Sequence, residues 1–368
     1  MPAHPNGVDR CECLTLSVTR LDSTDWGGGM LGEQLKAYRE ARGQSREDFA
    51  AFLNEGLERS YDRQRISRWE NGGERIPQAV VAFVRKHPVL PVEKPGPALV
   101  VSLANQKGGV GKTTGCVNVG RMLADRGYSV VLVDSDPQAN AGIHLSVDVV
   151  ACEDAEKTLY YVLKGAAKAE ECLVETRNPR LRVLPSSLKL AESETELAAQ
   201  QFSHNTLRSR LADLRRSVDF ILIDCPPTLG HLVTNALVAS DTVLIPCQTQ
   251  PLAFMGMGTL RKQIDFVRER GNPTLSLLGI VPTFYSGRTT QDQATLKDMH
   301  DTYGQEVHIF PPIPNTTLYP QSSAGGDALV AFNAKAPGIG TFDLVVQTLI
   351  AERDRRIVPA GHGVMTHG

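Results

Sequence analysis

The residues with the most recognisable chemistry lie in the run 106–114, which reads QKGGVGKTT. Its glycines let the backbone curl with N–H groups pointing inward, and a helix beginning near Lys112 adds the positive end of its dipole. Lys112 is placed to reach the β- and γ-phosphates of a nucleotide, and the Thr113 hydroxyl to ligate Mg²⁺. The spacing therefore predicts a P-loop. We expect nucleotide contacts from Gly108, Gly109, Val110, Gly111, Lys112, Thr113 and Thr114.

Carboxylates follow two other apolar runs. Asp134 and Asp136 come after the run 129–133, and Asp224 comes after the run 220–223. Ligands of open α/β sheets bind at the carboxyl ends of the strands, so these side chains are expected beside the phosphates. Asp224 would then hold Mg²⁺, directly or through water, as a Walker B carboxylate. For each run taken alone, the alternative is a buried strand that merely ends in aspartate.

These groups need a scaffold that brings them together. Apolar runs alternate with helical patterns over residues 98–356. The alternation predicts a mostly parallel sheet with helices on both faces, the α/β fold of a P-loop NTPase domain. The expected strands are 99–104, 129–133, 181–184, 219–223, 242–246 and 277–282. Residues 357–368, with proline and glycines, are expected to form a flexible tail.

A smaller all-helical domain is expected over residues 30–87. Ser45 and Asp48 have the spacing of a capping box, and a turn is expected around 54–56. The Arg/Gln-rich segment 61–71 follows, which completes the layout of a helix-turn-helix DNA reader. The expected DNA contacts are Arg63, Gln64, Arg65, Ser67 and Arg68. The alternative is a helical dimerisation or linker domain whose arginines only face solvent.

The remaining segments and the composition restrict the class of protein. Residues 1–29 are expected to form a flexible tail, with Met30 as an alternative start, and the proline-rich residues 88–97 an extended linker. The formal net charge is −2, so nucleic-acid binding must come from local patches. Neither a bilayer-spanning run of ~20 apolar residues nor a secretory signal pattern is found, which makes the cytoplasm the expected location.

The run KGGVGKTT resembles the deviant Walker A box of the ParA/MinD family of P-loop ATPases. An ordinary P-loop has glycine where Gln106 stands and does not require a lysine where Lys107 stands. The resemblance implies that Lys107 reaches across a dimer interface to the nucleotide of the partner subunit. It also implies ATP and Mg²⁺ as cofactors.

Two further strings support the same resemblance. DSDPQAN at 134–140 resembles the family's Walker A′ segment, which implies that Asp136 orients or activates the attacking water and that Asp134 supports the metal shell. Pro314 and Asn315 resemble the turn that holds the adenine. The residues implied around the metal are Thr113, Asp134 and Asp224.

The string ISRWENG at 66–72 resembles the Xre/Cro-type helix-turn-helix family. Together the resemblances imply a ParA-type DNA-partition ATPase of a plasmid or chromosome. ATP would hold two subunits in a sandwich dimer that binds DNA non-specifically, and a centromere-bound ParB-like partner would stimulate hydrolysis. The N-terminal domain would bind an operator for autorepression, and the protein would associate with the nucleoid.

Arg288 matches the position of an arginine that related partition ATPases use for sequence-independent DNA binding. Other basic residues could replace it or add to it. They are Arg261, Lys262, Arg353, Arg355 and Arg356.

Three alternatives remain from the sequence. A MinD-like positioning ATPase would need a basic amphipathic helix at its C-terminus, where this chain has proline and glycines. A transcription factor could use ATP only as an allosteric ligand. An iron–sulfur reductase would need paired cysteine ligands, a spacing that the seven cysteines do not show.

Overall fold

The chain divides into two compact units, Met1–Val89 and Leu90–Gly368. The expected N-terminal tail, the alternative start at Met30 and residues 88–95 of the expected linker lie outside the described residues. Ile357, expected to begin the C-terminal tail, is the last residue of a helix, and the rest of that tail also lies outside them. The computed structural model describes residues 31–41, 44–86, 96–198 and 203–357.

Helices that pack around large apolar side chains make up the described part of the first unit. Phe49, Leu53 and Trp69 are each 0% exposed and fix α3 against the first two helices. The predicted capping box is present, because the Ser45 hydroxyl accepts a hydrogen bond from Asp48 N and the Asp48 carboxylate accepts one from Ser45 N. The helices are α1 (Gly32–Ala41), α2 (Arg46–Leu57), α3 (Arg63–Glu70) and α4 (Gln78–Lys86).

The prediction of a turn around residues 54–56 is wrong, because α2 continues through these residues. Asn54 favours turns through its side chain, but here that side chain accepts a hydrogen bond from Tyr61 N at 2.6 Å and donates one to Tyr61 O at 2.9 Å. The helix is closed instead by Glu58, at φ 52° in the left-handed region. Asn54 thus holds the loop that leads into α3 without ending its own helix.

The second unit is built on a seven-stranded sheet of order β3-β4-β2-β5-β1-β6-β7. All neighbouring strands are parallel except β3 and β4, which confirms the predicted mostly parallel α/β class. All residues of β1, β2 and β5 are buried, as expected for parallel strands covered on both faces. The strands are β1 (Leu99–Leu103), β2 (Val130–Asp134), β3 (Val174–Glu175), β4 (Leu181–Leu184), β5 (Phe220–Asp224), β6 (Thr242–Gln248) and β7 (Ser276–Thr283).

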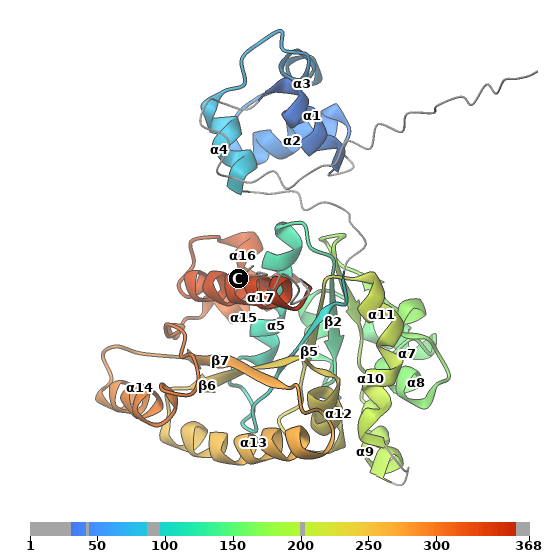
Figure 1. The fold of residues 1–368 in the computed structure, drawn as a ribbon, viewed down its shortest axis with the longest axis vertical. Helices are drawn as coiled ribbons and strands as arrows, with labels where there is room; N and C mark the ends of the chain where they lie inside the picture. The colour runs from blue at the N-terminus through green and yellow to red at the C-terminus, as the bar shows by residue number, and fades with distance from the viewer. Residues whose placement is uncertain (1–30, 42–43, 87–95, 199–202, 358–368) are drawn as a thin grey trace, which may run out of the picture. The chain divides into compact units, whose positions relative to one another are not determined.

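Helices cover both faces of this sheet, with α12 and α13 on one side and α5 and α17 on the other (Figure 1). The principal helices are α5 (Lys112–Asp125), α6 (Asn140–His144), α7 (Val149–Asp154), α8 (Leu159–Lys164), α9 (Leu190–Ala198), α10 (Thr206–Arg210), α11 (Ala212–Ser217), α12 (His231–Ala239), α13 (Pro251–Arg270), α14 (Thr290–Tyr303), α15 (Leu318–Gly325), α16 (Leu329–Phe332) and α17 (Ile339–Ile357). Two short 3₁₀ turns, Ala169–Cys172 and Ser203–Asn205, complete the described elements. In the part of the chain that is described, no helix is both long and apolar enough to cross a membrane.

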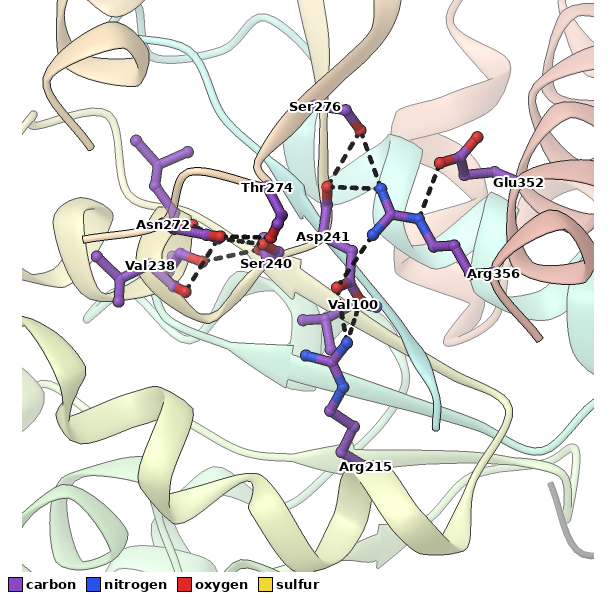
Figure 2. A network of polar contacts seen from close by, with 12 residues as sticks. Val100, Arg215, Val238, Ser240, Asp241, Asn272, Thr274, Ser276, Glu352 and Arg356 are labelled. Atoms are coloured by element: carbon purple, nitrogen blue, oxygen red, sulfur yellow. Dashed lines mark hydrogen bonds and ion pairs between the residues drawn. The ribbon is translucent and has the colours of Figure 1, made fainter. Parts of the chain in front are cut away.

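A polar network around Asp241 ties the amino ends of the strands to the last helix (Figure 2). The Asp241 carboxylate accepts hydrogen bonds from Val100 N at 2.9 Å and from Arg215 Nη2 at 2.6 and 2.8 Å. Arg356 of α17 pairs with the same carboxylate at 3.3 Å. Asp241, only 6% exposed, therefore holds β1, α11 and α17 together at the amino-terminal end of the strands, opposite the end that carries the P-loop.

Candidate functional site

The run 106–114 forms the connection between the carboxyl end of β1 and the start of α5. Gly109 and Gly111 have φ values of 70° and 94°, in the left-handed region where a side chain would be strained. Gly111 is also the residue that precedes the first turn of α5. The positive end of a long helix therefore meets the loop, as an anion site requires.

A cavity of about 710 Å³ opens over this loop. Its wall also includes residues that follow β2 and β5 and residues of α15. A cavity of this size is typical of nucleotide-sized ligands. Of the expected nucleotide contacts, it brings together Gly108, Gly109, Gly111, Lys112, Thr113 and Thr114. Val110 is different, because its side chain is buried and its carbonyl accepts a hydrogen bond from Thr283 Oγ1 at 2.9 Å.

Asp224 and Thr113, two of the residues expected around the metal, are hydrogen-bonded to each other. Thr113 Oγ1 donates a hydrogen bond to Asp224 Oδ2 at 2.6 Å, whereas Asp224 Oδ1 is buried without a partner among the described residues. Burial raises the pKa of Asp224 to about 7, although the Thr113 hydrogen bond and the charge of Lys112 oppose the rise. A buried oxygen is costly unless something satisfies it. The pair therefore fits a hard divalent cation, which prefers oxygen ligands.

The two aspartates at the carboxyl end of β2 have different surroundings. Asp136 lines the cavity. Asp134 is fully buried, and its carboxylate accepts N–H bonds from Asp136, Ala141 and Gly142 at 3.2, 3.0 and 3.1 Å. Burial, and then the neighbouring Asp224, raise the pKa of Asp134 well above its ordinary value. Asp134 thus positions the loop that carries Asp136, and its place in a metal shell stays a prediction.

The two lysines of the loop contact different groups. Lys112 lines the cavity and donates to Lys107 O at 3.2 Å; burial lowers its pKa, while nearby carboxylates oppose that shift. Lys107 does not line the cavity, and its Nζ donates to Gln248 Oε1 at 2.7 Å and to Gln250 Oε1 at 2.8 Å. Both of these partners are neutral. The charge of Lys107 is therefore not cancelled by its partners and is not directed at its own subunit's cavity.

A second, mostly apolar cavity shares Phe284 and Tyr319 with the first. Pro314 lines it, whereas Asn315 is not among its lining residues and donates its backbone N–H to Tyr285 O at 3.0 Å. Phe284 has φ 55°, which is unusual for a bulky residue and often found at functional sites. The turn expected to hold the base therefore lies beside the phosphate cavity.

In the first unit, α3 presents polar side chains on the face opposite Ile66 and Trp69. With 3.6 residues per turn, the centre of that face and its two edges can be assigned from spacing. The central residues are Gln64, Ser67 and Arg68, and the edge residues are Arg63 and Arg65. All five expected DNA contacts thus lie on the part of α3 that does not pack into the core.

Carboxylates pair with all three arginines of α3. Arg63 pairs with Glu47 at 2.9 Å. Arg65 and Arg68 both pair with Glu74, at 2.8 and 3.4 Å. Exposed pairs such as these contribute little to stability, but they determine where the guanidinium groups lie.

Arg288 is exposed in the turn between β7 and α14 and forms no ion pair within the described residues. The other basic candidates differ, because most of them already have acidic partners. Their ion pairs are Arg353–Asp219, Arg355–Glu352, Arg356–Asp241 and Arg261–Glu306. The Arg356 pair is the one in Figure 2. Among the described residues, Arg288 and Lys262 are the basic candidates that have no acidic partner.

Sequence reasoning missed the glutamines beside Lys107 and also Glu194 of α9. Glu194 accepts hydrogen bonds from His231 N at 2.8 Å and Leu232 N at 3.2 Å, so it caps α12 just after the loop that follows Asp224. These partners are 37 and 38 residues away along the chain. No local pattern marks such a contact; only the order of the elements in space reveals it.

Comparisons with known proteins agree with both units. Residues 98–277 match a family model described as an AAA domain, and residues 30–93 match one described as a helix-turn-helix domain. The chain is 34% identical over 263 residues to the chromosome partitioning protein ParA of Caulobacter vibrioides, covering 71% of this chain and 97% of that protein. It is 32% identical over 239 residues to the sporulation initiation inhibitor protein Soj of Bacillus subtilis, covering 65% and 93%.

One similar solved structure carries a nucleotide and a metal. It is cobyrinic acid a,c-diamide synthase from Mycobacterium smegmatis with bound ATP analogue and magnesium. The identity is 32%, the TM-score is 0.61, and the match covers 72% of this chain and 100% of that chain.

Proposed function

Because this chain belongs to the ParA family of P-loop ATPases, we propose that it is a DNA-partition ATPase that segregates a plasmid or chromosome. One observation carries the proposal. A single cavity combines Lys112 and Thr113 of the P-loop with Asp136, and Asp224 touches Thr113 at 2.6 Å. A phosphate-binding loop, a carboxylate for Mg²⁺ and a second carboxylate near the phosphates are the groups that ATP hydrolysis needs.

Each group would have a distinct role. Lys112 and the N–H groups of the loop would bind the phosphates, and Thr113 with Asp224 would hold Mg²⁺. When bound, Mg²⁺ neutralises charge that develops on the phosphates. Asp136, whose backbone N–H donates a hydrogen bond to Asp134, would orient or activate the attacking water. The ATP analogue and magnesium in a structure 32% identical to this chain support ATP and Mg²⁺ as the cofactors.

Lys107 would act on the nucleotide of a second subunit in an ATP-bound sandwich dimer. Its contacts with Gln248 and Gln250, outside its own cavity, support this assignment. A ParB-like partner would stimulate hydrolysis, and the dimer would bind DNA of any sequence through Arg288. The Pro314–Asn315 turn would lie beside the adenine. The protein would work in the cytoplasm, associated with the nucleoid.

The helix-turn-helix unit would read an operator and repress its own operon. Gln64, Ser67 and Arg68 at the centre of the exposed face of α3 would meet base edges, with Arg63 at the rim. Arg65, by its position beside Trp69, would support the helix face more than read bases. Operator binding would not require ATP.

DNA binding by two groups of variants tests this division of roles. Each base contact of α3 discriminates by about 1–3 kcal/mol, so Gln64→Ala and Arg68→Ala should abolish operator preference and keep ATP-dependent binding to random duplex. Arg288→Ala should weaken binding to any duplex with ATP and flatten the salt dependence by about one unit per lost phosphate contact. Both groups are compared on operator and random DNA across a salt series. Parallel loss of both activities in the α3 variants would contradict the division.

A further inference from the structure

Glu74, in the loop between α3 and α4, contacts two arginines of α3 at once. Its Oε1 accepts hydrogen bonds from Arg65 Nε and Nη2 at 3.0 and 2.8 Å, and its Oε2 lies 3.4 Å from Arg68 Nε. The hydrogen bonds from Arg65 are the largest cause of the lowered pKa of Glu74. The carboxylate is therefore ionised at neutral pH and spans two side chains that are three positions apart.

Arg65 is held by more than this carboxylate. Its guanidinium carbon lies 5.7 Å from the ring centroids of both Tyr61 and Trp69, within cation–π distance. Trp69 is fully buried, so one of these two rings is a fixed part of the core. A guanidinium held between rings and a carboxylate is poorly placed to swing toward a phosphate. Arg65 thus braces Glu74, and Glu74 in turn restrains Arg68 near the centre of the exposed face of α3.

We propose that Glu74 is a specificity-determining residue, which restrains Arg65 and Arg68 so that only a duplex with matching base edges draws Arg68 away. The proposal rests on the DNA-reading role proposed above for α3. A mismatched duplex offers mainly phosphate attraction, which the negative charge of Glu74 opposes. A matched duplex also offers a pair of base acceptors, such as guanine O6 and N7, that can replace the carboxylate as the partner of Arg68.

The test uses the full chain without ATP, so that DNA binding by the second unit does not interfere. Glu74→Gln keeps the shape of the side chain and removes its charge. Its affinity for random duplex should rise several-fold, with the salt dependence steeper by about one unit as Arg68 becomes free to reach a phosphate. Its preference for the best duplex that the wild type selects from a random pool should fall by about tenfold.

Two further variants separate this role from general charge or folding effects. Glu55→Gln removes one charge from an exposed residue of α2 that forms no ion pair among the described residues, and should change neither quantity. Glu74→Asp keeps the charge and should keep the wild-type salt dependence. Trp69 fluorescence checks that each variant is folded. If Glu74→Gln matches Glu55→Gln in both measurements, the inference is wrong.

The random-duplex salt series gives an answer even when the pool yields no preferred duplex. A pool that yields no preferred duplex would count against the operator role of the first unit. An unchanged slope in Glu74→Gln would count against the role of Glu74. The two failures are therefore distinguishable.

Discussion

At the scale of single residues, the P-loop separates two lysines that lie five positions apart. Lys112 lines the phosphate cavity, whereas Lys107 is held outside it by two neutral glutamines. A cation without a charged partner interacts strongly with an anion that comes close. We therefore expect the two lysines to have separate anionic targets, the nucleotide of their own subunit for Lys112 and that of another subunit for Lys107.

Substitution of each lysine should have a different consequence. Lys112→Ala removes a charge-assisted contact with the phosphates, so nucleotide affinity should fall about 10- to 100-fold, the equivalent of roughly 1.5–3 kcal/mol. Lys107→Ala should bind ATP with nearly normal affinity and lose hydrolysis. Titration with a fluorescent ATP analogue and a phosphate-release assay measure the two quantities. Equal and near-normal behaviour of both variants would contradict the assignment.

Asp224 predicts a pH dependence of the protein without Mg²⁺. Burial raises the pKa of Asp224 from 3.8 to about 7, and the pKa of the neighbouring Asp134 is raised as well. Because the raised pKa belongs to the folded state, the stabilising neutral form is present at low pH and is lost as the pH rises through about 7. The melting temperature without Mg²⁺ should therefore fall between about pH 4 and pH 7 and level off above pH 7, by roughly 2–4 °C for each kcal/mol lost.

Mg²⁺ with ATP should reverse this loss, because the cation favours the ionised carboxylate. Asp224→Asn should show a smaller pH dependence and little response to Mg²⁺. Thermal melts in the absence and in the presence of Mg²⁺ and ATP measure both effects. A wild-type melting temperature that is independent of pH in this range, or an unchanged Mg²⁺ response in Asp224→Asn, would show that this carboxylate is not the metal ligand.

At the scale of elements, most of the scaffold could be predicted from the sequence. Continuous apolar runs such as 130–133 are long enough to define buried parallel strands, and this one leads directly into the aspartates of the candidate site. The short helices around residues 203–217 and the edge strand β3 could not be predicted, because they are only a few residues long and depend on packing. The prediction of a turn at Asn54 was wrong for a related reason, since the side chain of Asn54 bonds to Tyr61 while its backbone stays helical.

The residues of the candidate site also divide into those that the sequence could predict and those that it could not. Lys112, Thr113 and Asp136 belong to local strings whose spacing alone indicates their chemistry. Gln248 meets Lys107 only because β6 lies next to β1 in the sheet, 141 residues further along the chain. Contacts between distant segments carry no local signature, so the sequence could not indicate them.

A buried ion-pair cluster joins the first three helices. The side chain of Glu70 in α3 is 0% exposed, and its two oxygens accept hydrogen bonds from Arg39 of α1 at 2.5 Å and Arg46 of α2 at 2.7 Å. Burial alone would raise the pKa of Glu70, but the two arginines lower it overall. The stabilisation from the ionised form is therefore present above the ordinary value of 4.5 and is lost as the pH falls through the lowered pKa.

Glu70→Gln should lower the free energy of unfolding of the first unit by roughly 3 kcal/mol at neutral pH. This is the low end of the cost of breaking a buried pair, because Arg46 is 31% exposed. The variant should also lose less stability than the wild type below pH 4.5. Trp69 lies in the core of the first unit and no tryptophan follows it in the sequence, so urea unfolding followed by its fluorescence reports on that unit. A neutral-pH stability within 0.5 kcal/mol of the wild type, the usual range for surface substitutions, would contradict the role of this cluster.

At the scale of the whole molecule, one chain of net charge −2 is proposed to carry two different DNA-binding surfaces. On α3, carboxylates screen the arginines, which suits selective binding. Arg288 has no such partner among the described residues, which suits attraction to any phosphate. Local pairing of charges, more than their total number, therefore distinguishes the two tasks.

In the proposed dimer, two subunits share each hydrolysis site, with Asp136 from one and Lys107 from the other. Mixing the inactive variants Lys107→Ala and Asp136→Ala tests it most directly. In a mixed dimer, the site of the Lys107→Ala subunit keeps its own Asp136 and receives Lys107 from its partner. An equal mixture should therefore recover about a quarter of the wild-type ATPase rate on DNA, since half of the dimers are mixed and each has one complete site of two. If the mixture stays at the sum of the two separate variants while both still bind ATP and dimerise, Lys107 does not act across the interface and the account is wrong.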